Sequence, residues 1–348
     1  MNNKLEKVTA VLVGCGGMSG EWLKIAGDIL NLEIVGLVDI KKENALARAS
    51  EYALEKTEIG TDIGAVLQKV SPDIVFNCTT PEAHTQVTLQ ALGHGCHVLV
   101  EKPMADSMDN AKRIVTAAKK AGKLVAVTQN YRYNARIRRL KNFLSRRDLR
   151  QLTTVNSDFY IGAHFGGFRD HMRHVLLLDM AIHTFDAARF ITGKDPLSVY
   201  CKEWNPSGSW YDHDASAVAV FQMTGGIVYT YRGSWCAEGL NTPWESEWRI
   251  ICEKGSIKWD GADHYQVQVV SETGGFISNY QDLQIPEYDA KDKVGGHASI
   301  IKEFVHCVRM GEKPETICTD NIKSLSMVFG AIESAKRQGA IDIESDIL

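Results

Sequence analysis

The sequence predicts an α/β protein in which a doubly wound parallel sheet is followed by an α+β domain with a large open, mostly antiparallel sheet. Three observations support this prediction. Over the first 130 residues, apolar runs of strand length alternate with helical segments, a pattern that favours parallel strand pairing. Beyond residue 196, strand-like runs follow one another directly, which favours antiparallel pairing. The turn at residues 224–226 joins two of these runs as a hairpin.

The first domain is expected to span residues 1–130. Its strands are predicted at residues 8–13, 33–39, 73–78, 97–100 and 124–127, which are short apolar runs typical of buried parallel strands. Its helices are predicted at residues 21–30, 43–55, 62–70, 82–92 and 108–121. Ligands of such sheets bind beyond the carboxyl ends of the strands. Segments 79–81 and 101–103 follow two such ends and are therefore candidate binding segments.

The second domain is expected to span residues 131–348. It begins with a basic helix at 135–147, a strand at 153–161 and an apolar helix at 175–191. The other strands are predicted at residues 197–204, 215–223, 226–234, 246–252, 256–259 and 266–270. Apolar residues three or four positions apart predict two final helices, around residues 300–308 and 322–332. We expect that these helices can pack back on the first domain.

The composition is that of an ordinary globular protein. The 348 residues are 44% hydrophobic and 24% charged, and a net charge of −4 gives no attraction to nucleic acid or an anionic membrane. The first seven residues are polar, and no apolar stretch could cross a bilayer, so we expect neither a signal peptide nor a membrane span. Eight cysteines without a Cys-x-x-Cys pair fit reduced thiols. We therefore expect a cytoplasmic protein that binds neither nucleic acid nor a membrane.

The first predicted strand runs directly into Gly14-x-Gly16-x-x-Ser19, with Gly17 and Met18 between the small residues. In a dinucleotide-binding turn, the first glycine permits the tight bend and the second lets the backbone approach the pyrophosphate. The third small residue lets helix and strand pack closely, and the pyrophosphate lies on N–H groups at the helix N-terminus. Gly-rich turns also occur for packing alone. The helix, second strand and acidic residue that follow in order favour dinucleotide binding.

Asp39 ends the second predicted strand, about twenty residues after the glycines, where a ribose-binding carboxylate is expected. A carboxylate there accepts hydrogen bonds from the ribose hydroxyls and repels a 2′-phosphate, so NAD is predicted over NADP. Lys41 and Lys42 follow at once and could favour a phosphate, which keeps NADP as the less favoured alternative. Asp39 could instead be only a polar strand end or a helix N-cap.

Asp179, His183 and Asp186 recur at helical spacing within the apolar segment 175–191. On an α-helix these three residues would share one face. Polar groups on a buried helix must pair with one another or face a cavity. Two interpretations stay open at this point: a self-satisfied Asp–His–Asp network, or a histidine held by carboxylates as a general base.

Other polar candidates lie at a strand end and in a Gly-rich loop. Lys102 could donate a hydrogen bond to a substrate hydroxyl, or could be a solvated lysine or the partner of Glu101. The loop before the apolar helix contains three residues that could reach a substrate: His164, Arg169 and His171. His171 and His174 have no third metal ligand at convincing spacing, so we predict a surface pair and no metal. The tryptophans, mostly at or after residue 204, fit core packing as well as stacking on sugar rings.

In this order, the motifs resemble the Gfo/Idh/MocA family of oxidoreductases, which includes glucose–fructose oxidoreductase and inositol dehydrogenase. The resemblance covers essentially the whole chain, and its Glu-Lys-Pro motif is the most specific part. The matching residues are Gly14 to Met18, Asp39, Thr80, Pro81, His84, Glu101, Lys102, Pro103, Asp179, His183 and Asp186, with helices opening near His297 and spanning 320–339.

The resemblance implies a Rossmann domain followed by an open-sheet domain through which copies of the chain associate, as a homodimer or a homotetramer. It implies catalytic roles for Lys102, Asp179 and His183. It also implies NAD as the cofactor, bound by Gly14, Gly16, Gly17, Met18, Asp39, Thr79, Thr80, Pro81, His84, Glu101, Lys102 and Asn130.

The activity implied by the resemblance is NAD-dependent oxidation of a secondary hydroxyl on a cyclic polyol, sugar or sugar derivative, with an inositol-like substrate as the first choice. His183 would take the hydroxyl proton, while Lys102 would position the oxygen and stabilise its negative charge. Asp179 would bind a substrate hydroxyl or hold the other two groups, and Asp186 would orient His183. Two alternatives are a glycoside hydrolase that retains NAD and a non-catalytic dinucleotide-binding regulator. The intact catalytic residues argue against the regulator.

Overall fold

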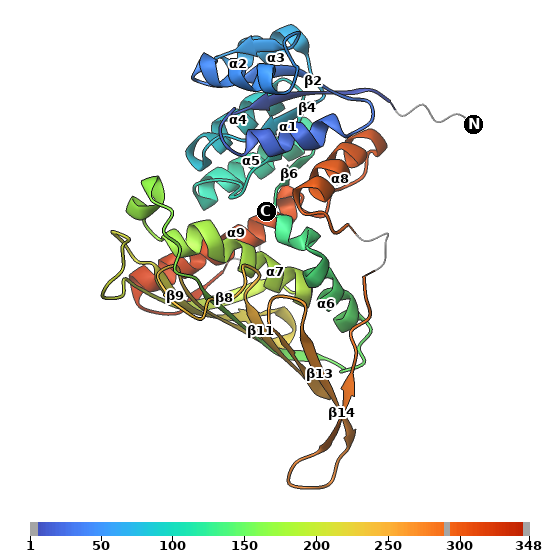
Figure 1. The fold of residues 1–348 in the computed structure, drawn as a ribbon, viewed down its shortest axis with the longest axis vertical. Coiled ribbons are helices and arrows are strands. Elements are labelled where there is room, and N and C mark those ends of the chain that lie inside the picture. The colour runs from blue at the N-terminus through green and yellow to red at the C-terminus, as the bar shows by residue number, and fades with distance from the viewer. Residues whose placement is uncertain (1–5, 289–292, 344–348) are drawn as a thin grey trace, which may run out of the picture. The chain divides into compact units, whose positions relative to one another are not determined.

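The computed structural model describes residues 6–288 and 293–343, which form two compact units (Figure 1). The first unit contains residues 6–130 and 295–322, and the second contains residues 131–288, 293–294 and 323–343. The predicted boundary gave residues 295–322 to the second domain, and the structure differs there because α8 (His297–Met310) packs against α1 (Ser19–Gly27). The predicted outer limits, residues 1 and 348, and most of the predicted polar start lie outside the described residues.

In the first unit, six described strands form one parallel sheet in the order β3-β2-β1-β4-β5-β6, which confirms the predicted doubly wound sheet. The strands are β1 (Val8–Val13), β2 (Leu32–Val38), β3 (Glu58–Gly60), β4 (Ile74–Asn77), β5 (His97–Val100) and β6 (Val125–Val127). The sequence did not predict β3, whose three residues are too few to show an apolar run. The strand order reverses between β1 and β4, and ligands of such sheets bind at that point.

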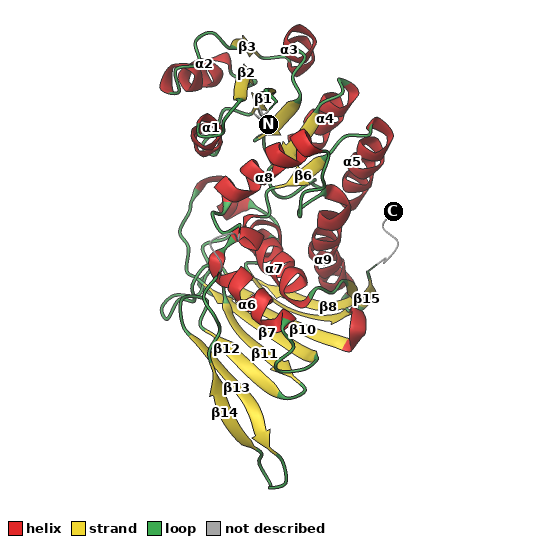
Figure 2. Ribbon diagram, turned by 90° about the vertical axis from the view of Figure 1, so that its right-hand side faces the viewer, coloured by secondary structure: helices red, strands yellow, loops and turns green. Residues whose placement is uncertain are grey.

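Helices cover both faces of this sheet (Figure 2). With α1 and α8, they are α2 (Lys42–Glu51), α3 (Ile63–Val70), α4 (Pro81–Gly93) and α5 (Met108–Ala121). Asp62 and Ser107 accept hydrogen bonds from backbone N–H groups of the first turns of α3 and α5, so capping residues set these starts. The structure differs from the predicted limits at α1, which begins two residues earlier and ends at Gly27, and at α2, which ends at Glu51.

His97, the first residue of β5, should make the protein less stable in acid. Its Nδ1 accepts a hydrogen bond from the Leu124 backbone N–H at 3.0 Å, which requires a neutral ring. Burial, with a smaller contribution from Lys123, lowers the pKa of His97 from 6.5 to about 4. The unfolded chain therefore binds more protons than the folded one between these two values. This stabilisation is present above pH 6.5 and is lost as the pH falls towards 4.

The measurement is the thermal midpoint, followed by circular dichroism at neutral and acidic pH. Glutamine at position 97 keeps an oxygen that can accept a hydrogen bond but does not titrate. The His97→Gln variant should therefore lose less thermal stability between the two pH values than the unsubstituted protein does. Equal losses in both proteins would contradict a contribution from His97.

In the second unit, nine described strands form one sheet in the order β14-β13-β12-β11-β7-β10-β9-β8-β15. Among them only β7 and β10 pair in parallel, which confirms the predicted mostly antiparallel sheet. The strands are β7 (Leu152–Tyr160), β8 (Pro196–Trp204), β9 (Ser216–Met223), β10 (Ile227–Ser234), β11 (Glu247–Cys252), β12 (Gly255–Trp259), β13 (Tyr265–Glu272), β14 (Asn279–Leu283) and β15 (Ile341–Asp342). The sequence did not predict β14 and β15.

One face of this sheet is covered by α6 (Ala135–Ser145), α7 (Ile182–Thr192) and the part of α9 (Cys318–Arg337) that belongs to this unit (Figure 2). The other face exposes apolar side chains of β8, β9 and β10, among them Tyr200, Trp204, Val220 and Val228. Association of copies through this face stays a prediction. Within residues 6–288 and 293–343, no helix is long and apolar enough to cross a membrane.

Short helical turns complete the second unit, and one of them interrupts the predicted helix 175–191. They are η1 (Asn130–Tyr133), which begins in the first unit, η2 (Gly167–His171), η3 (Leu176–Ala181) and η4 (Thr224–Gly226). η3 is a π-helix, and α7 begins directly after it. A π-helix has wider turns than an α-helix, and single π-turns are frequent at functional sites.

Candidate active site

The glycine turn between β1 and α1 fits a dinucleotide. Gly14 has a φ of +89°, and a Cβ on it would lie 2.7 Å from backbone atoms of Cys78, so the turn requires glycine there. A Cβ on Gly16 or Gly17 would meet no protein atom within 4 Å. The turn therefore leaves room for a ligand directly before α1, where backbone N–H groups favour a pyrophosphate. Met18, half-exposed, is the last residue of the turn.

An arginine of α2 braces this turn. The third small residue of the motif, Ser19, donates a hydrogen bond to the Gly16 carbonyl at 2.6 Å and accepts one from Arg48 Nε at 3.0 Å. Arg48 Nη2 also donates to the Gly16 carbonyl at 2.9 Å. A hydroxyl at position 19 therefore allows a contact that glycine or alanine would not. Nothing in the local sequence pattern indicated Arg48.

Asp39 follows β2 and is fixed beside the glycine turn. Its Oδ2 accepts a hydrogen bond from the Cys15 backbone N–H at 2.8 Å. Its Oδ1 accepts from the Lys41 backbone N–H at 2.8 Å and from Asn44 Nδ2 at 3.1 Å. The carboxylate thus has a defined position next to the turn, where a negative charge repels a 2′-phosphate.

Replacing Asp39 with asparagine should shift cofactor preference towards NADP. Asparagine has nearly the same size but removes the negative charge, so the ratio of the Kd for NADPH to that for NADH should fall by at least about tenfold. Fluorescence titration of both reduced cofactors measures this ratio without a substrate. The control is Asp62→Asn, because asparagine also caps a helix and α3 lies outside the turn. An unchanged ratio in the Asp39 variant would contradict the assigned role.

The predicted cofactor residues after β4 are held by one buried histidine. His84 lies between two backbone carbonyls, with Nδ1 2.7 Å from the Pro103 oxygen and Nε2 3.0 Å from the Thr79 oxygen. It therefore ties segment 79–81 to segment 101–103. Thr80 occupies the N-cap position of α4 without a side-chain capping hydrogen bond, and Pro81 is the first residue of the helix, a position that suits proline. Direct cofactor contacts of Thr79, Thr80, Pro81 and His84 stay predictions.

Glu101 holds the Glu-Lys-Pro segment in place through contacts that the sequence did not indicate. Its Oε1 accepts a hydrogen bond from Trp22 Nε1 at 3.0 Å, and its Oε2 accepts from Thr128 Oγ1 at 2.9 Å. The Lys102 backbone N–H donates to the same Oε2 at 3.1 Å. His297 Nε2, at the start of α8, lies 3.7 Å from Oε1. The buried carboxylate therefore fixes the backbone from which the Lys102 side chain extends.

In the second unit, Asp179 lies in η3 and His183 lies in the first turn of α7. Asp179 Oδ2 accepts a hydrogen bond from Arg169 Nε at 2.8 Å. His183 is 9% exposed, and the Tyr131 ring stacks on it with 4.7 Å between the ring centroids and 27° between the planes. Arg169 and Tyr131 are therefore neighbours of the two predicted catalytic residues of this unit.

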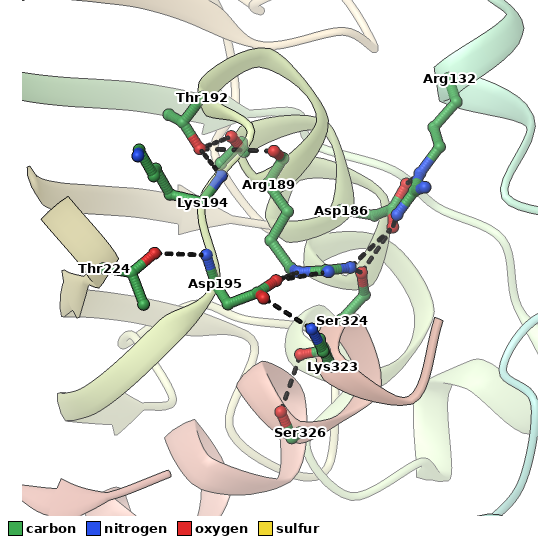
Figure 3. Close-up of polar contacts among 11 residues, drawn as sticks. Arg132, Asp186, Arg189, Thr192, Lys194, Asp195, Thr224, Lys323, Ser324 and Ser326 are labelled. Atoms are coloured by element: carbon green, nitrogen blue, oxygen red, sulfur yellow. Dashed lines mark hydrogen bonds and ion pairs between the residues drawn. The ribbon is translucent and has the colours of Figure 1, made fainter. Parts of the chain in front are cut away.

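Asp186, expected to orient His183, is the centre of a separate buried network (Figure 3). Its two carboxylate oxygens accept hydrogen bonds from Arg132 Nε and Nη2, both at 2.7 Å, and Oδ1 also accepts from Ser324 Oγ. Of the two interpretations left open, the self-satisfied Asp–His–Asp network therefore does not include Asp186. The physical reason is that the charged guanidinium of Arg132, 54 positions away in the sequence, binds the buried Asp186 carboxylate in a bidentate contact.

The same network joins α7 to α9 within the second unit (Figure 3). Arg189 Nη1 donates to Ser324 Oγ at 2.8 Å, and Arg189 Nη2 donates to Asp195 Oδ1 at 2.7 Å. Lys323 Nζ donates to Asp195 Oδ2 at 2.6 Å. Burial raises the pKa of Asp195, but the hydrogen bonds from Lys323 and Arg189 outweigh it and lower the pKa overall.

The predicted loop residues have different partners. Arg169 lies beside Asp179, whereas His164 Nε2 lies 2.8 Å from Glu238 and its ring stacks on Trp210. His171 Nδ1 lies 2.6 Å from Asp212, whose hydrogen bond raises the pKa of the imidazole. His174 pairs with the buried Glu203 instead of joining His171. Within the described part of the chain, no group of three or more His, Cys, Asp or Glu side chains could hold a metal ion.

Three aromatic rings, which we call the aromatic platform, lie beside this site: Phe165, Trp235 and Trp244. Trp235 is buried, while Phe165 and Trp244 are 45% and 48% exposed. Both exposed rings pack on Trp235, with centroid distances of 5.2 and 5.8 Å. The Arg169 guanidinium lies 4.9 Å from the Phe165 centroid, and the Trp244 carbonyl accepts a hydrogen bond from Tyr131 Oη at 2.8 Å. The platform thus contacts Arg169, which binds Asp179, and Tyr131, which stacks on His183.

Comparison with known protein families gives a matching result for both units. Residues 8–129 match the model of an oxidoreductase family with an NAD-binding Rossmann fold. Residues 137–258 match the GFO/IDH/MocA C-terminal domain. The fold and the glycine turn thus define an NAD-binding oxidoreductase, which confirms the predicted class of enzyme and its cofactor. The chain belongs to the GFO/IDH/MocA family, as its motifs predicted.

Individual relatives match nearly the whole chain. This chain is 22% identical over 362 residues to D-apiose dehydrogenase of Paraburkholderia graminis, and the match covers 98% of this chain and 91% of the relative. It is 22% identical over 348 residues to myo-inositol 2-dehydrogenase of Thermotoga maritima, covering 95% and 96%. The crystal structure of an oxidoreductase from Agrobacterium radiobacter, in complex with NAD+, L-tartaric acid and magnesium, superposes with a TM-score of 0.84. It is 19% identical, with 97% and 99% of the two chains covered, and shares the fold.

Proposed function

We propose that this chain is an NAD-dependent dehydrogenase that oxidises a secondary hydroxyl of a cyclic polyol, sugar or sugar derivative to a ketone. The observation that carries the proposal is the surroundings of α7 in the second unit. The buried imidazole of His183 stacks on Tyr131, and the carboxylate of Asp179 is held by Arg169. Tyr131 and Arg169 both contact the aromatic platform, two of whose rings are half-exposed. The imidazole can accept a proton, the carboxylate can bind a hydroxyl, and aromatic rings pack well on the C–H face of a sugar. Two relatives named as dehydrogenases of a sugar and a cyclic polyol support the same substrate class.

In the proposed reaction the alcohol carbon loses a hydride and its hydroxyl loses a proton. NAD, when bound, supplies the acceptor for the hydride. His183 takes the hydroxyl proton on a ring nitrogen, and Lys102 donates a hydrogen bond to the oxygen as its negative charge develops. Asp179, held by Arg169, accepts a hydrogen bond from a neighbouring hydroxyl of the substrate. The products are the ketone and NADH, with the proton on the imidazole.

Residues of the first unit bind the cofactor in the proposed enzyme. The turn from Gly14 to Met18 holds the pyrophosphate, and Asp39 accepts hydrogen bonds from the ribose hydroxyls. Segments 79–81 and 101–103 and residue Asn130 contact the remainder of the cofactor. Glu101 contributes by fixing Lys102, since its own carboxylate oxygens already accept hydrogen bonds from Trp22 and Thr128.

The test is NADH formation by the purified protein with a panel of inositols, aldoses and anhydrosugars, with NAD and NADP compared. The proposal expects turnover of a cyclic polyol or sugar with NAD and formation of the corresponding ketone. Glycosides belong in the same panel, because a hydrolase that retains NAD would release free sugar without net NADH. That result would replace the proposed dehydrogenase.

Trp244→Ala should raise KM for a cyclic substrate by about three- to tenfold and change kcat little. The variant removes a half-exposed ring that stacks on the substrate in both ground and transition states. KM for an open-chain polyol should change less. The matched control is Trp204→Ala. Trp204 is similarly exposed, but it alternates with the buried Glu203 on β8 and therefore lies on the face of the sheet that exposes Tyr200. Equal effects of both variants would contradict a substrate contact at Trp244.

A further inference from the structure

Tyr131 is a neighbour of the proposed base that neither the motifs nor the family match assigns. Its ring lies over the imidazole of His183 in a stacked arrangement, 4.7 Å from centroid to centroid. We propose that Tyr131 is a positioning residue for His183, whose ring fixes the imidazole and stabilises its protonated form. This inference rests on the proposed function, in which His183 takes the substrate proton.

The Tyr131 ring is held at its outer end by a hydrogen bond. Its hydroxyl donates to the Trp244 backbone carbonyl at 2.8 Å. Burial raises the pKa of this hydroxyl far above neutrality, so the proton needed for the bond is always present. The ring therefore cannot swing away from His183 without breaking this bond.

A buried salt bridge holds the same ring at its backbone end. Arg132 follows Tyr131 in η1, and Asp186 follows His183 by three residues on α7. The bidentate contact between Arg132 and Asp186, with both distances at 2.7 Å, therefore joins the two backbone segments that carry the stacked rings (Figure 3). Both partners are almost fully buried, so the separation of the two segments is tightly constrained.

The stacked geometry has two consequences for the imidazole. The Tyr131 ring covers one face of His183 and restricts rotation of the imidazole about its last torsion. The electron-rich face of an aromatic ring also attracts a cation within about 6 Å of its centroid. Imidazolium forms when His183 takes a proton, so the attraction grows as the reaction proceeds. A merely space-filling side chain would provide the first effect and not the second.

The experiment is a pH titration of His183 in the full chain, followed by NMR of histidine labelled with ¹³C and ¹⁵N. The His183→Gln variant identifies the resonance. In Tyr131→Leu, which keeps an apolar cover but lacks the ring, the titration midpoint should fall by about half a unit. In Tyr131→Phe, which keeps the ring, it should stay close to that of the unsubstituted protein. An unchanged or raised midpoint in Tyr131→Leu overturns the proposal.

Tyr265 provides a matched control. Its ring also stacks on an aromatic partner, Trp259, and its hydroxyl also donates to a backbone carbonyl, that of Arg136. Tyr265→Leu should leave the His183 titration unchanged, and a shift of equal size there would overturn a specific effect of Tyr131. Because the titration needs no substrate, it reports on the stacked pair even when the activity panel contradicts the proposed dehydrogenase.

Discussion

Replacing His183 with alanine should lower kcat by about a hundredfold to ten-thousandfold, the range typical of lost general acid–base catalysis. The variant keeps the glycine turn and Asp39 of the first unit, so the Kd for NADH should not change. The physical reason is that the hydroxyl proton would then have no positioned acceptor as the hydride leaves. Steady-state kinetics with the substrate found in the panel, together with cofactor titration, separates these two effects.

The control for this variant is His264→Ala, which removes an exposed histidine after β12. Its turnover should match that of the unsubstituted protein. If His183→Ala also retained full turnover, His183 could not be the base. The acceptor would then have to be sought among other groups, and Tyr131 would lose its proposed catalytic consequence.

Replacing Arg132 with leucine should lower the free energy of unfolding by about 3–5 kcal/mol, the usual cost of leaving a buried charge without its partner. Asp186 is fully buried, and Arg132 supplies two of its hydrogen bonds. Ser324 would remain as a hydrogen-bond donor without a charge, and the remaining cation, Arg189, lies 4.0 Å from Oδ1, beyond hydrogen-bond distance. Chemical denaturation followed by circular dichroism measures the change.

Two further variants make this prediction specific. Replacing both Arg132 and Asp186 with leucine should recover much of the loss, because no unpaired charge then stays buried. Arg136→Leu breaks an ion pair of similar geometry with Asp263, but Asp263 is exposed, so this variant should change the free energy of unfolding far less. Equal effects of Arg132→Leu and Arg136→Leu would contradict the importance of burial.

Most of the fold could be predicted because its signals are local. The strand β1, the glycine turn and the strand β2 follow one another within the first 39 residues, and each shows in its own composition. The hairpin of β9 and β10 is equally local. In contrast, β15 contains two residues and exists because it pairs with β8, more than 130 positions earlier. The sequence also contains no periodicity that marks η3 as a π-helix.

The candidate site divides in the same way. Gly14, Asp39, Lys102 and His183 could be selected because each occupies a fixed place in a short motif. The residues that hold them could not. Arg132 lies 54 positions from Asp186, Ser324 lies 138 positions from it, and Trp22 lies 79 positions from Glu101. Such pairings depend on tertiary packing and leave no trace in local spacing.

The π-helical turn η3 makes the direction of Asp179 sensitive to the deletion of a single residue. A π-turn corresponds to one extra residue within an α-helix, so removing a single residue from η3 would restore α-helical geometry. Asp179 would then rotate around the helix axis relative to His183, while α7 and its bonds to Arg132 and Ser324 would keep their register. The direction of the carboxylate can therefore be altered separately from the position of the imidazole. One deletion would therefore turn Asp179 in a new direction while the rest of the scaffold stays unchanged.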